Sequence, residues 1–259
     1  MKNTELVKRC LDVAQHHKTI YVMGCFGAPL TGGNVSRYCN NHDYNKQPSR
    51  TKMIKAAADK TPPVFGFDCV NLIKGILWGW DADPAKTYGG AVYKANGVPD
   101  VSADGMIQRC SEVSTSGWDK LVPGEAVWLP GHIGVYIGDG LVVECTPAWD
   151  NCVQVTACNR TIPGYHRRDW KKHGKIPTVD YSAPKPATPA PVEAKPEPVY
   201  KTLLDVPESY RPAIRKLMEA GALGGYSDPD PARLEDNVLN VTETFCRVFT
   251  VLNNLGKLD

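Results

Sequence analysis

The sequence lacks the features that mark membrane-spanning, exported and zinc-binding proteins. None of its apolar runs approaches the roughly 20 residues that a helix needs to cross a bilayer. The first nine residues, MKNTELVKR, contain no apolar signal core, and no two cysteines have the Cys-x-x-Cys spacing of many zinc sites. The sequence also lacks a large excess of charge of one sign, since 30 Lys and Arg residues nearly balance 28 Asp and Glu residues and leave a net charge of +2. We therefore expect no membrane partner, and the mild charge argues against a nucleic-acid-binding protein.

Cysteine is present, but it forms no evident disulfide framework. The nine cysteines are an odd number with irregular spacing, and the chain shows no export signal, so we expect reduced thiols. A zinc site could be imagined from Cys145, Cys152, Cys158 and His166. Because no close cysteine pair is present, we expect no metal site and no other cofactor.

One cysteine stands at a junction between a strand and a helix. Residues 63–65 (PVF) are strand-like and lead into Gly66, and Asp68 is a good helix N-cap residue. From Cys69 onward apolar residues recur at helical spacing, namely Val70, Ile73, Ile76 and Leu77. This pattern places the Cys69 thiol in the first turn of a buried helix, where exposed N–H groups and the helix dipole favour thiolate over thiol. Cys69 is therefore a candidate nucleophile if a histidine can reach it, and otherwise a small core residue.

A histidine lies at the start of a predicted β-hairpin. Residues 123–145 read as one strand followed by a hairpin that turns at residues 138–140 (GDG). A three-residue loop would place Ile137 opposite Leu141 and Val135 opposite Val143. One face of the hairpin is then entirely apolar, with Ile133, Val135, Ile137, Leu141, Val143 and Cys145. The other face carries His132, Gly134, Tyr136, Val142 and Glu144.

This register brings a carboxylate to the histidine. Glu144 lies diagonally across from His132, and such neighbours are about 7–8 Å apart, within reach of a long side chain. A two-residue loop would instead put the two side chains on opposite faces. A carboxylate beside an imidazole orients the ring, while Gly131 and Gly134 would leave room for a substrate on the histidine's face. The alternatives are a structural histidine and a solvated glutamate.

Four segments occur in the order typical of a known enzyme family. They are residues 21–24 (YVMG), 66–69 (GFDC), 123–128 (PGEAVW) and 131–138 (GHIGVYIG). As an ordered set they resemble NlpC-type papain-like peptidoglycan peptidases, and more narrowly the cysteine endolysins of phages and prophages of gut Firmicutes. The resemblance covers about residues 6–177 and implies an α+β, papain-like NlpC-type fold. In that fold an antiparallel sheet packs against helices, and the nucleophile opens the central helix.

The resemblance also implies roles for residues of this chain. By resemblance, Cys69 is the nucleophile, His132 is the general base and Glu144 is the third polar residue, a position that the family more often fills with His, Asn or Gln. It places Tyr21 near the oxyanion position, where its hydroxyl would help to stabilise the tetrahedral intermediate. It places Asp68 in the substrate-binding motif.

The chain departs from the family pattern in two places. Residues 70–71 (VN) stand where the family usually has Ser-Gly, which argues against an exopeptidase-like grip on a free amino terminus. A long insertion, about residues 28–60, separates the tyrosine segment from the cysteine segment and is polar and basic with interleaved tyrosines. It is either a surface excursion with one short helix at residues 52–58, or a lid or groove wall that recognises the glycan or the stem peptide.

Composition divides the chain into three parts. The predicted catalytic domain, residues 1–178, ends near a charged run at residues 167–173 (RRDWKKH), which we expect to be a terminal strand with Trp170 packed inward and its charges solvated. Residues 179–200 form a linker dominated by Pro, Ala, Lys and Glu, which predicts an extended, semi-rigid spacer. Residues 201–259 form a small, mainly helical module.

The small module resembles a single degenerate S-layer-homology repeat. Its resemblance includes residues 205–207 (DVP) and 224–228 (GGYSD), and helices are predicted from near Ser209 and from Thr242. Residues 242–245 (TETF) replace the Thr-Arg-Ala-Glu element through which such repeats bind secondary wall polymers. We expect this module to bind the wall, or to self-associate into a homodimer through its apolar helix faces.

Four functions from different classes fit these features. The first is a cysteine peptidase that cuts a stem-peptide bond of bacterial peptidoglycan, by resemblance the bond from D-iGlu to the diamino acid. The second is an N-acetylmuramoyl-L-alanine amidase that uses the same residues. The third is a thiol acyltransferase of the related lecithin–retinol type, which the linker and second module disfavour, and the fourth is a non-catalytic wall-binding protein, which the intact Cys69 and His132 disfavour. A wall hydrolase without an export signal fits a phage enzyme that stays in the host cytoplasm until it is released to the cell wall, and it equally fits a chain that has lost its leader.

Overall fold

The structure is a computed structural model that describes the chain except for residues 59, 183–198, 221, 224–240 and 255–259. The chain divides into two compact units, Met1–Pro189 and Ala190–Asp259, which are described separately. Both units contain helices and strands. The α+β class predicted from the sequence is therefore confirmed.

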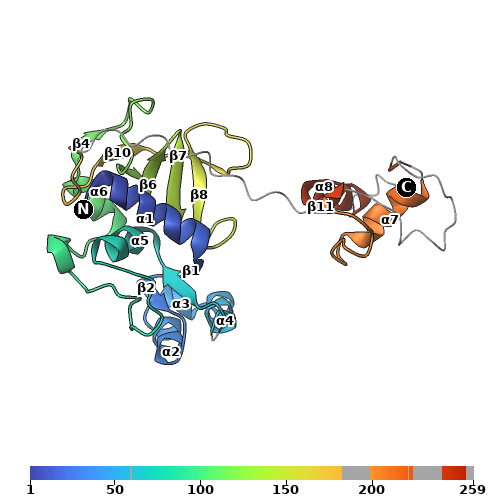
Figure 1. Cartoon of the computed structure of the whole chain (residues 1–259), viewed down its shortest axis with the longest axis horizontal. Coiled ribbons are helices and arrows are strands. Elements are labelled where there is room, and N and C mark those ends of the chain that lie inside the picture. The colour runs from blue at the N-terminus through green and yellow to red at the C-terminus, as the bar shows by residue number, and fades with distance from the viewer. Residues whose placement is uncertain (59, 183–198, 221, 224–240, 255–259) are drawn as a thin grey trace. The chain divides into compact units, whose positions relative to one another are not determined.

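The first unit is built on a seven-stranded sheet with the strand order β4-β10-β5-β6-β7-β8-β9 (Figure 1). Neighbouring strands are antiparallel, except that β8 and β9 are parallel. In chain order the strands are β4 (Ser111–Ser114), β5 (Ala126–Leu129), β6 (His132–Gly138), β7 (Leu141–Cys145), β8 (Val153–Cys158), β9 (Arg167–Arg168) and β10 (Lys172–Lys175).

Three helices pack against one face of this sheet: α1 (Asn3–His16), α5 (Cys69–Leu77) and α6 (Ala103–Arg109). In Figure 1, α1 runs across the strands from β6 to β8. The apolar face predicted for the hairpin forms this core with the helices, through Ile133, Val135, Ile137, Val143 and Cys145. The opposite face of the sheet carries a smaller cluster that includes Tyr136, Val142 and Trp170.

A second, three-stranded sheet with the order β1-β3-β2 carries the insertion. Its strands are β1 (Lys18–Tyr21), β2 (Phe26–Pro29) and β3 (Val64–Phe67). The insertion folds into three helices, α2 (Gly33–Asn40), α3 (Asp43–Lys46) and α4 (Pro48–Ala56), so the expectation of one short helix at residues 52–58 is wrong. Its buried side chains form a small core with this sheet, including Leu30, Tyr38, Cys39 and Ile54.

The turn between β6 and β7 differs from the predicted one. Val135 lies opposite Val143 as expected, but Gly138, not Ile137, pairs with Leu141. Asp139 and Gly140 both have positive φ, 53° and 75°, as a two-residue type I′ turn requires. An irregularity between Tyr136 and Gly138 absorbs the remaining residue, in the manner of a β-bulge. The bulge keeps His132 and Glu144 on one face of the hairpin despite the short turn.

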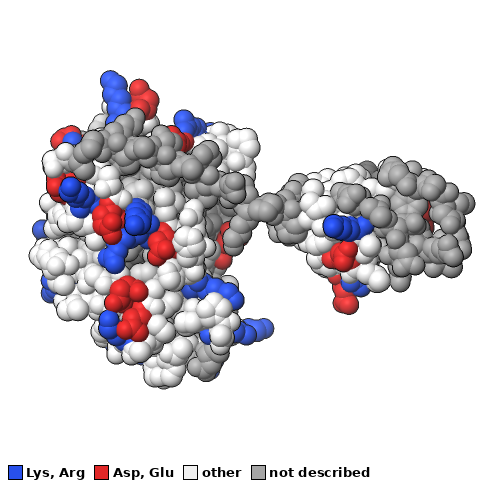
Figure 2. Space-filling model, in the orientation of Figure 1, with Lys and Arg blue, Asp and Glu red and all other residues white. Residues whose placement is uncertain are grey.

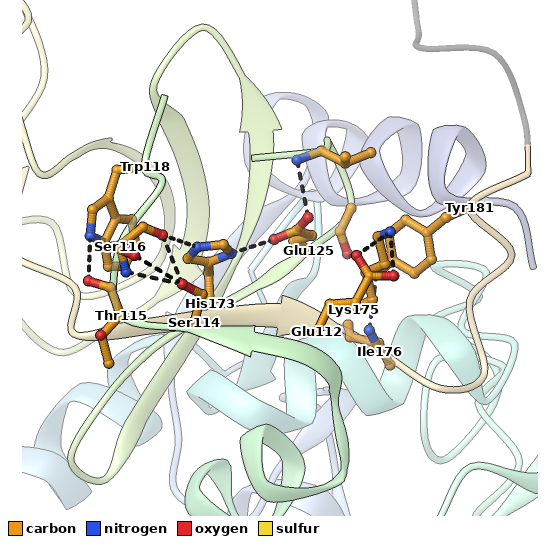
Figure 3. A network of polar contacts seen from close by, with 12 residues as sticks. Glu112, Ser114, Thr115, Ser116, Trp118, Glu125, His173, Lys175, Ile176 and Tyr181 are labelled. Carbon is orange, nitrogen blue, oxygen red and sulfur yellow. Dashed lines mark hydrogen bonds and ion pairs between the residues drawn. The ribbon is translucent and has the colours of Figure 1, made fainter. Parts of the chain in front are cut away.

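The first unit extends beyond residue 178, the boundary expected from the sequence. Val179 is buried in the core, and the carbonyl of Asp180 accepts the N–H of Asn3 at 2.9 Å. The hydroxyl of Tyr181 is hydrogen bonded to main-chain groups of this unit (Figure 3). The prediction that the linker begins at residue 179 is therefore wrong, because Val179, Asp180 and Tyr181 are anchored in the domain.

The second unit contains the two predicted helices, α7 (Arg211–Glu219) and α8 (Glu243–Asn254), which pack together. A short pair of strands, β11 (Val199–Tyr200) and β12 (Val241–Thr242), precedes α7 and α8 respectively. Its small core includes Leu203, Val206, Ile214 and Met218. The expected motif at residues 224–228 lies outside the described residues.

Side chains of both signs are interspersed on the face of the first unit that Figure 2 shows. Basic side chains gather at the edge where α4 lies, and this helix contains the exposed Lys52 and Lys55. Within the described part of the chain, no helix combines the length and the apolar character needed to cross a membrane.

Candidate active site

Asp68 and Cys69 stand where β3 passes into α5. Asp68 caps the helix, since its Oδ1 accepts the N–H of Asn71 at 2.8 Å. Its Oδ2 accepts the N–H of Gly24 at 2.8 Å and the side-chain amide of Asn71 at 2.7 Å. Burial raises the pKa of Asp68, although these hydrogen bonds act in the opposite direction. The structure thus gives Asp68 a capping role, and its contact with a substrate stays a prediction.

The Cys69 thiol lies at the N-terminus of α5 as predicted, but it is nearly buried. Its Sγ is 4.0 Å from the carbonyl oxygen of Gly131, and the N–H of Ile133 is a second main-chain neighbour. Burial, and then the charge of Asp68, raise the pKa of Cys69 to about 12, although nearby N–H groups lower it. The N–H groups at the helix terminus thus favour the thiolate as expected, but burial outweighs them and the resting thiol is neutral.

His132 and Glu144 form the pair that the hairpin register predicts. His132 Nε2 lies 2.6 Å from Glu144 Oε2. Glu144 is fully buried, and its carboxylate also accepts hydrogen bonds from Thr156 Oγ1 at 2.6 Å and from Arg168 Nε at 2.8 Å. Burial alone would raise the pKa of Glu144, but the contacts with His132, and then with Arg168, lower it further than burial raises it. Glu144 is therefore an ionised carboxylate held in one orientation.

The imidazole of His132 is fixed by contacts with its neighbours. Because a carboxylate can only accept, the ring donates through Nε2, and its basic nitrogen is Nδ1. Trp170 stacks on the ring, with centroids 5.4 Å apart and planes inclined by 10°. Among the described hydrogen bonds, none joins this ring directly to the Cys69 thiol, whose acceptor is the carbonyl of Gly131. The thiol thus lies against main-chain atoms of Gly131 and Ile133, the residues on either side of His132.

Tyr21 ends β1 close to Cys69. Burial raises the pKa of Tyr21 well above its ordinary value, and the nearby Cys69 and Asp68 add to this shift. The hydroxyl therefore remains protonated and able to donate. Its described hydrogen-bond acceptor is the sulfur of Met23, at 3.8 Å, which is a weak partner. This placement is compatible with the predicted oxyanion role, which stays a prediction.

The insertion is fastened to the Tyr21 segment. The side chain of Asn45 in α3 accepts the N–H of Met23 at 3.1 Å and donates to the Met23 carbonyl at 2.8 Å. Arg50 of α4 is buried and donates to the carbonyl of Tyr21 and, at 2.6 Å, to Asn151 Oδ1. The insertion is therefore a fixed wall beside Tyr21, and recognition of a substrate by this wall stays a prediction.

The two glycines that flank the histidine segment differ in the space around them. A Cβ on Gly131 would meet nothing within 4 Å, whereas a Cβ on Gly134 would lie 2.7 Å from Val142 Cγ1 and 3.2 Å from Trp170. The expectation that Gly134 leaves room for a substrate is therefore wrong, because Trp170 packs there. Asp104 fixes the open turn, since its Oδ1 accepts the N–H of Gly131 at 2.9 Å.

A second histidine–glutamate pair in the same sheet is unsuited to the same chemistry (Figure 3). His173 Nδ1 lies 2.6 Å from Glu125 Oε2, and its Nε2 lies 2.8 Å from the carbonyl oxygen of Ser116. Both side chains are buried, and both ring nitrogens face oxygen acceptors. This histidine therefore has a structural role, tying β10 to the chain around β5 and to the turn after β4.

Sequence reasoning missed two partners of Glu144. Thr156 could have been found, because it alternates with the apolar Val155 and Ala157 along β8 and so faces the same side as Glu144. Arg168 has no comparable local signal. The expectation that the charges of residues 167–173 are solvated is wrong for Arg168 and for the buried His173, whereas Trp170 packs inward as predicted.

Comparison of the chain with protein-family models, with curated proteins and with solved structures finds no match. The described residues contain no group of three or more His, Cys, Asp or Glu side chains that could hold a metal ion. The geometry around Cys69 and His132 therefore carries the functional interpretation.

Proposed function

We propose that the first unit is a papain-like, NlpC-type cysteine peptidase that cuts an amide bond in the stem peptide of bacterial peptidoglycan. The observation that carries this proposal is the position of Cys69 at the N-terminus of α5, against main-chain atoms of Gly131 and Ile133, the two residues that flank His132. The ring of His132 is held by the buried Glu144. A nucleophile, a base and an orienting carboxylate are the three parts that this chemistry needs. The substrate class comes from the motif resemblance.

The proposed reaction has two stages. The Cys69 thiol turns from the Gly131 carbonyl toward Nδ1 of His132, which takes the thiol proton while sulfur attacks the amide carbon. The oxyanion accepts hydrogen bonds from the N–H of Cys69 and the hydroxyl of Tyr21. The C–N bond then breaks, His132 gives its proton to the leaving amine, and a thioester remains on Cys69. In the second stage water attacks the thioester with His132 as base, which releases the carboxylic acid and restores the thiol.

We propose the bond from D-iGlu to the diamino acid as the scissile bond. The side chain of Asn71, which follows the helix cap Asp68, supports cleavage of a bond inside the stem peptide over recognition of a free amino terminus. The Asn71 amide, which stands in the Ser-Gly position of the family, is bound to Asp68 at 2.7 Å. Asp68 is thereby occupied within the protein, which disfavours a grip on a free amino terminus.

The alternative within the same chemistry is an N-acetylmuramoyl-L-alanine amidase. Cys69, His132 and Glu144 would play the same roles, because both reactions transfer an acyl group from an amide to water. The two differ only in which amide enters the site, so product analysis separates them.

For the second unit we propose binding to the bacterial wall, through a secondary wall polymer, after release of the enzyme from the host cytoplasm. Exposed apolar side chains in this unit, Leu204 and Val248, favour self-association into a homodimer as the alternative. Binding of the purified chain to sacculi, measured beside its oligomeric state in solution, separates the two.

The decisive experiment is digestion of purified sacculi followed by mass spectrometry of the released fragments, with the native chain and with Cys69→Ser. We expect new amino groups on the diamino acid with the native chain and a loss of release of at least a thousandfold with Cys69→Ser. New amino groups on L-Ala would favour the amidase. Equal fragments from both proteins, or none from either, would contradict a thiol hydrolase.

A further inference from the structure

Arg168 makes contacts that neither the sequence motifs nor the proposed mechanism requires. Its Nε lies 2.8 Å from the Glu144 carboxylate, and its Nη2 donates to Thr146 Oγ1 at 3.1 Å. Its guanidinium carbon is 4.6 Å from the ring centre of Trp149 and 5.8 Å from that of Trp170. Two hydrogen-bonded side chains and two rings thus hold the guanidinium in place.

The buried Glu144 carboxylate needs a positive charge beside it, since an unpaired buried charge is costly. Two groups in contact with this carboxylate can carry a positive charge, His132 and Arg168. The third contact, Thr156, is neutral. The neighbouring Arg167 is exposed and pairs instead with Asp169 at 2.8 Å. An arginine is protonated at every pH at which the protein would work, so Arg168 supplies the counter-charge permanently.

We propose that Arg168 is a positioning residue that supplies the counter-charge of Glu144 and so keeps His132 in the neutral form that can take a proton from Cys69. With Arg168 in place, the neutral ring donates Nε2–H to Glu144 and leaves Nδ1 basic. Without it, the cation remaining beside Glu144 among the described residues is a protonated His132, which has no free nitrogen for a proton. The inference rests on the proposed function for its catalytic meaning.

The loop between β7 and β8 supports a requirement for a fixed guanidinium. Trp149 in this loop has a φ of 56°, which is uncommon for a bulky side chain and costs conformational energy. Its ring is stacked on His166, with centroids 4.7 Å apart and planes inclined by 2°. The strained backbone thus holds the tryptophan ring beside Arg168.

The test is the protonation of the His132 ring, followed by ¹⁵N NMR of ring nitrogens across pH in the free full-length protein. In the native chain we expect a neutral ring with a proton on Nε2 at pH 7.5. In Arg168→Gln we expect the doubly protonated fraction of the ring at pH 7.5 to rise severalfold, because the imidazolium is then the cation left beside Glu144. Arg168→Lys keeps the positive charge, so it should show less than half of the rise seen in Arg168→Gln.

Two further proteins make the result specific. Arg167→Gln removes the adjacent exposed arginine and should leave the doubly protonated fraction of the His132 ring at its native value, since exposed pairs contribute little. In a Glu144→Gln background, Arg168→Gln should change the doubly protonated fraction by less than half as much, because Arg168 acts through Glu144. Equal changes in Arg167→Gln and Arg168→Gln, or no change in Arg168→Gln, would overturn the proposal.

The native chain alone can also overturn it. A His132 ring that is already doubly protonated at pH 7.5 would contradict the proposal even if the Arg168 variants failed to fold. None of these measurements uses a substrate. A native chain that shows the expected titration but cuts no sacculi would therefore refute the proposed function and leave the charge-balancing role intact.

Discussion

At Cys69, opposing effects act on one sulfur atom. The first turn of α5 and the N–H of Ile133 favour a thiolate, while burial and the neighbouring Asp68 favour the neutral thiol and prevail. The structure therefore describes a resting thiol whose proton must leave during the reaction. The same pKa shift makes the free energy of unfolding depend on pH. Because the pKa of Cys69 is raised from 9.0 to about 12, the unfolded chain ionises first, and this residue's contribution to stability falls as pH rises above 9.

The protonated thiol predicts slow alkylation. We expect the rate at which iodoacetamide modifies Cys69 in the folded protein to keep rising between pH 7 and pH 11, without a plateau. The same residue in urea should follow an ordinary thiol, with half of its maximal rate near pH 9 and a plateau above about pH 10. Mass spectrometry of the peptide that contains Cys69 separates it from the other cysteines. A plateau below pH 7 in the folded protein would show a preformed thiolate and contradict this account.

The Tyr21 hydroxyl offers a test that separates catalysis from packing. Its described acceptor is the weakly accepting sulfur of Met23, so Tyr21→Phe should change the free energy of unfolding by less than about 1 kcal/mol. If the hydroxyl donates to the oxyanion, kcat on a muropeptide should fall about 100-fold. Tyr44→Phe is the matched control, since its ring packs edge-on against Tyr21 at 5.8 Å, and it should leave kcat unchanged. Equal activities of the two variants would remove Tyr21 from the mechanism.

At the scale of elements, the β6–β7 hairpin determines which side chains meet. Period-two alternation was enough to predict that Glu144 faces His132, because a buried apolar face fixes the register. It was not enough to predict the turn, where a two-residue loop and a bulge have the same effect on the faces as a three-residue loop. Arg168 was beyond this reasoning, since it reaches Glu144 from a strand that follows β8 after a long connection.

The same hairpin depends on the absence of a side chain at Gly134. A Cβ there would lie 2.7 Å from Val142 Cγ1 and 3.1 Å from the carbonyl oxygen of Val143. We expect Gly134→Ala to lower the free energy of unfolding by about 1–3 kcal/mol, because the strand must shift against its neighbour. Gly33→Ala is the control, since a Cβ at that first position of α2 meets nothing within 4 Å and should change stability by less than about 0.5 kcal/mol. Urea titrations measure the free energy of unfolding of both variants. Equal losses in Gly134→Ala and Gly33→Ala would show that Gly134 is not tightly packed.

The insertion shows where sequence patterns stop. Its polar composition indicated a surface segment with one helix, yet it forms three helices with a small core of their own. The stabilising contacts are between residues distant in sequence, such as Asn45 with Met23 and Arg50 with Asn151. No local pattern encodes such pairs, so both the number of helices and the wall beside Tyr21 required the structure.

At the scale of the whole molecule, composition predicts that two units exist, because a segment dominated by Pro, Ala, Lys and Glu cannot bury a core. It does not predict where the first unit ends. Val179 is buried, the main-chain N–H of Asp180 donates to Met1 at 2.8 Å, and Tyr181 Oη donates to the carbonyl of Gly124 at 2.8 Å. These contacts join the end of the domain to its beginning and to the sheet, at separations that a composition boundary ignores.

The boundary can be tested by shortening the chain. A chain of residues 1–182 keeps all of these contacts and should melt like the first unit of the full-length protein, with unchanged activity on a soluble muropeptide. A chain of residues 1–178 loses the burial of Val179 and several hydrogen bonds, each worth roughly 1 kcal/mol, or about 3–5 kcal/mol together. For a domain of this size that loss lowers the melting temperature by about 10 °C. Scanning calorimetry of the two chains measures the difference directly, and coincident transitions would mean that residues 179–181 add nothing to the stability of the domain.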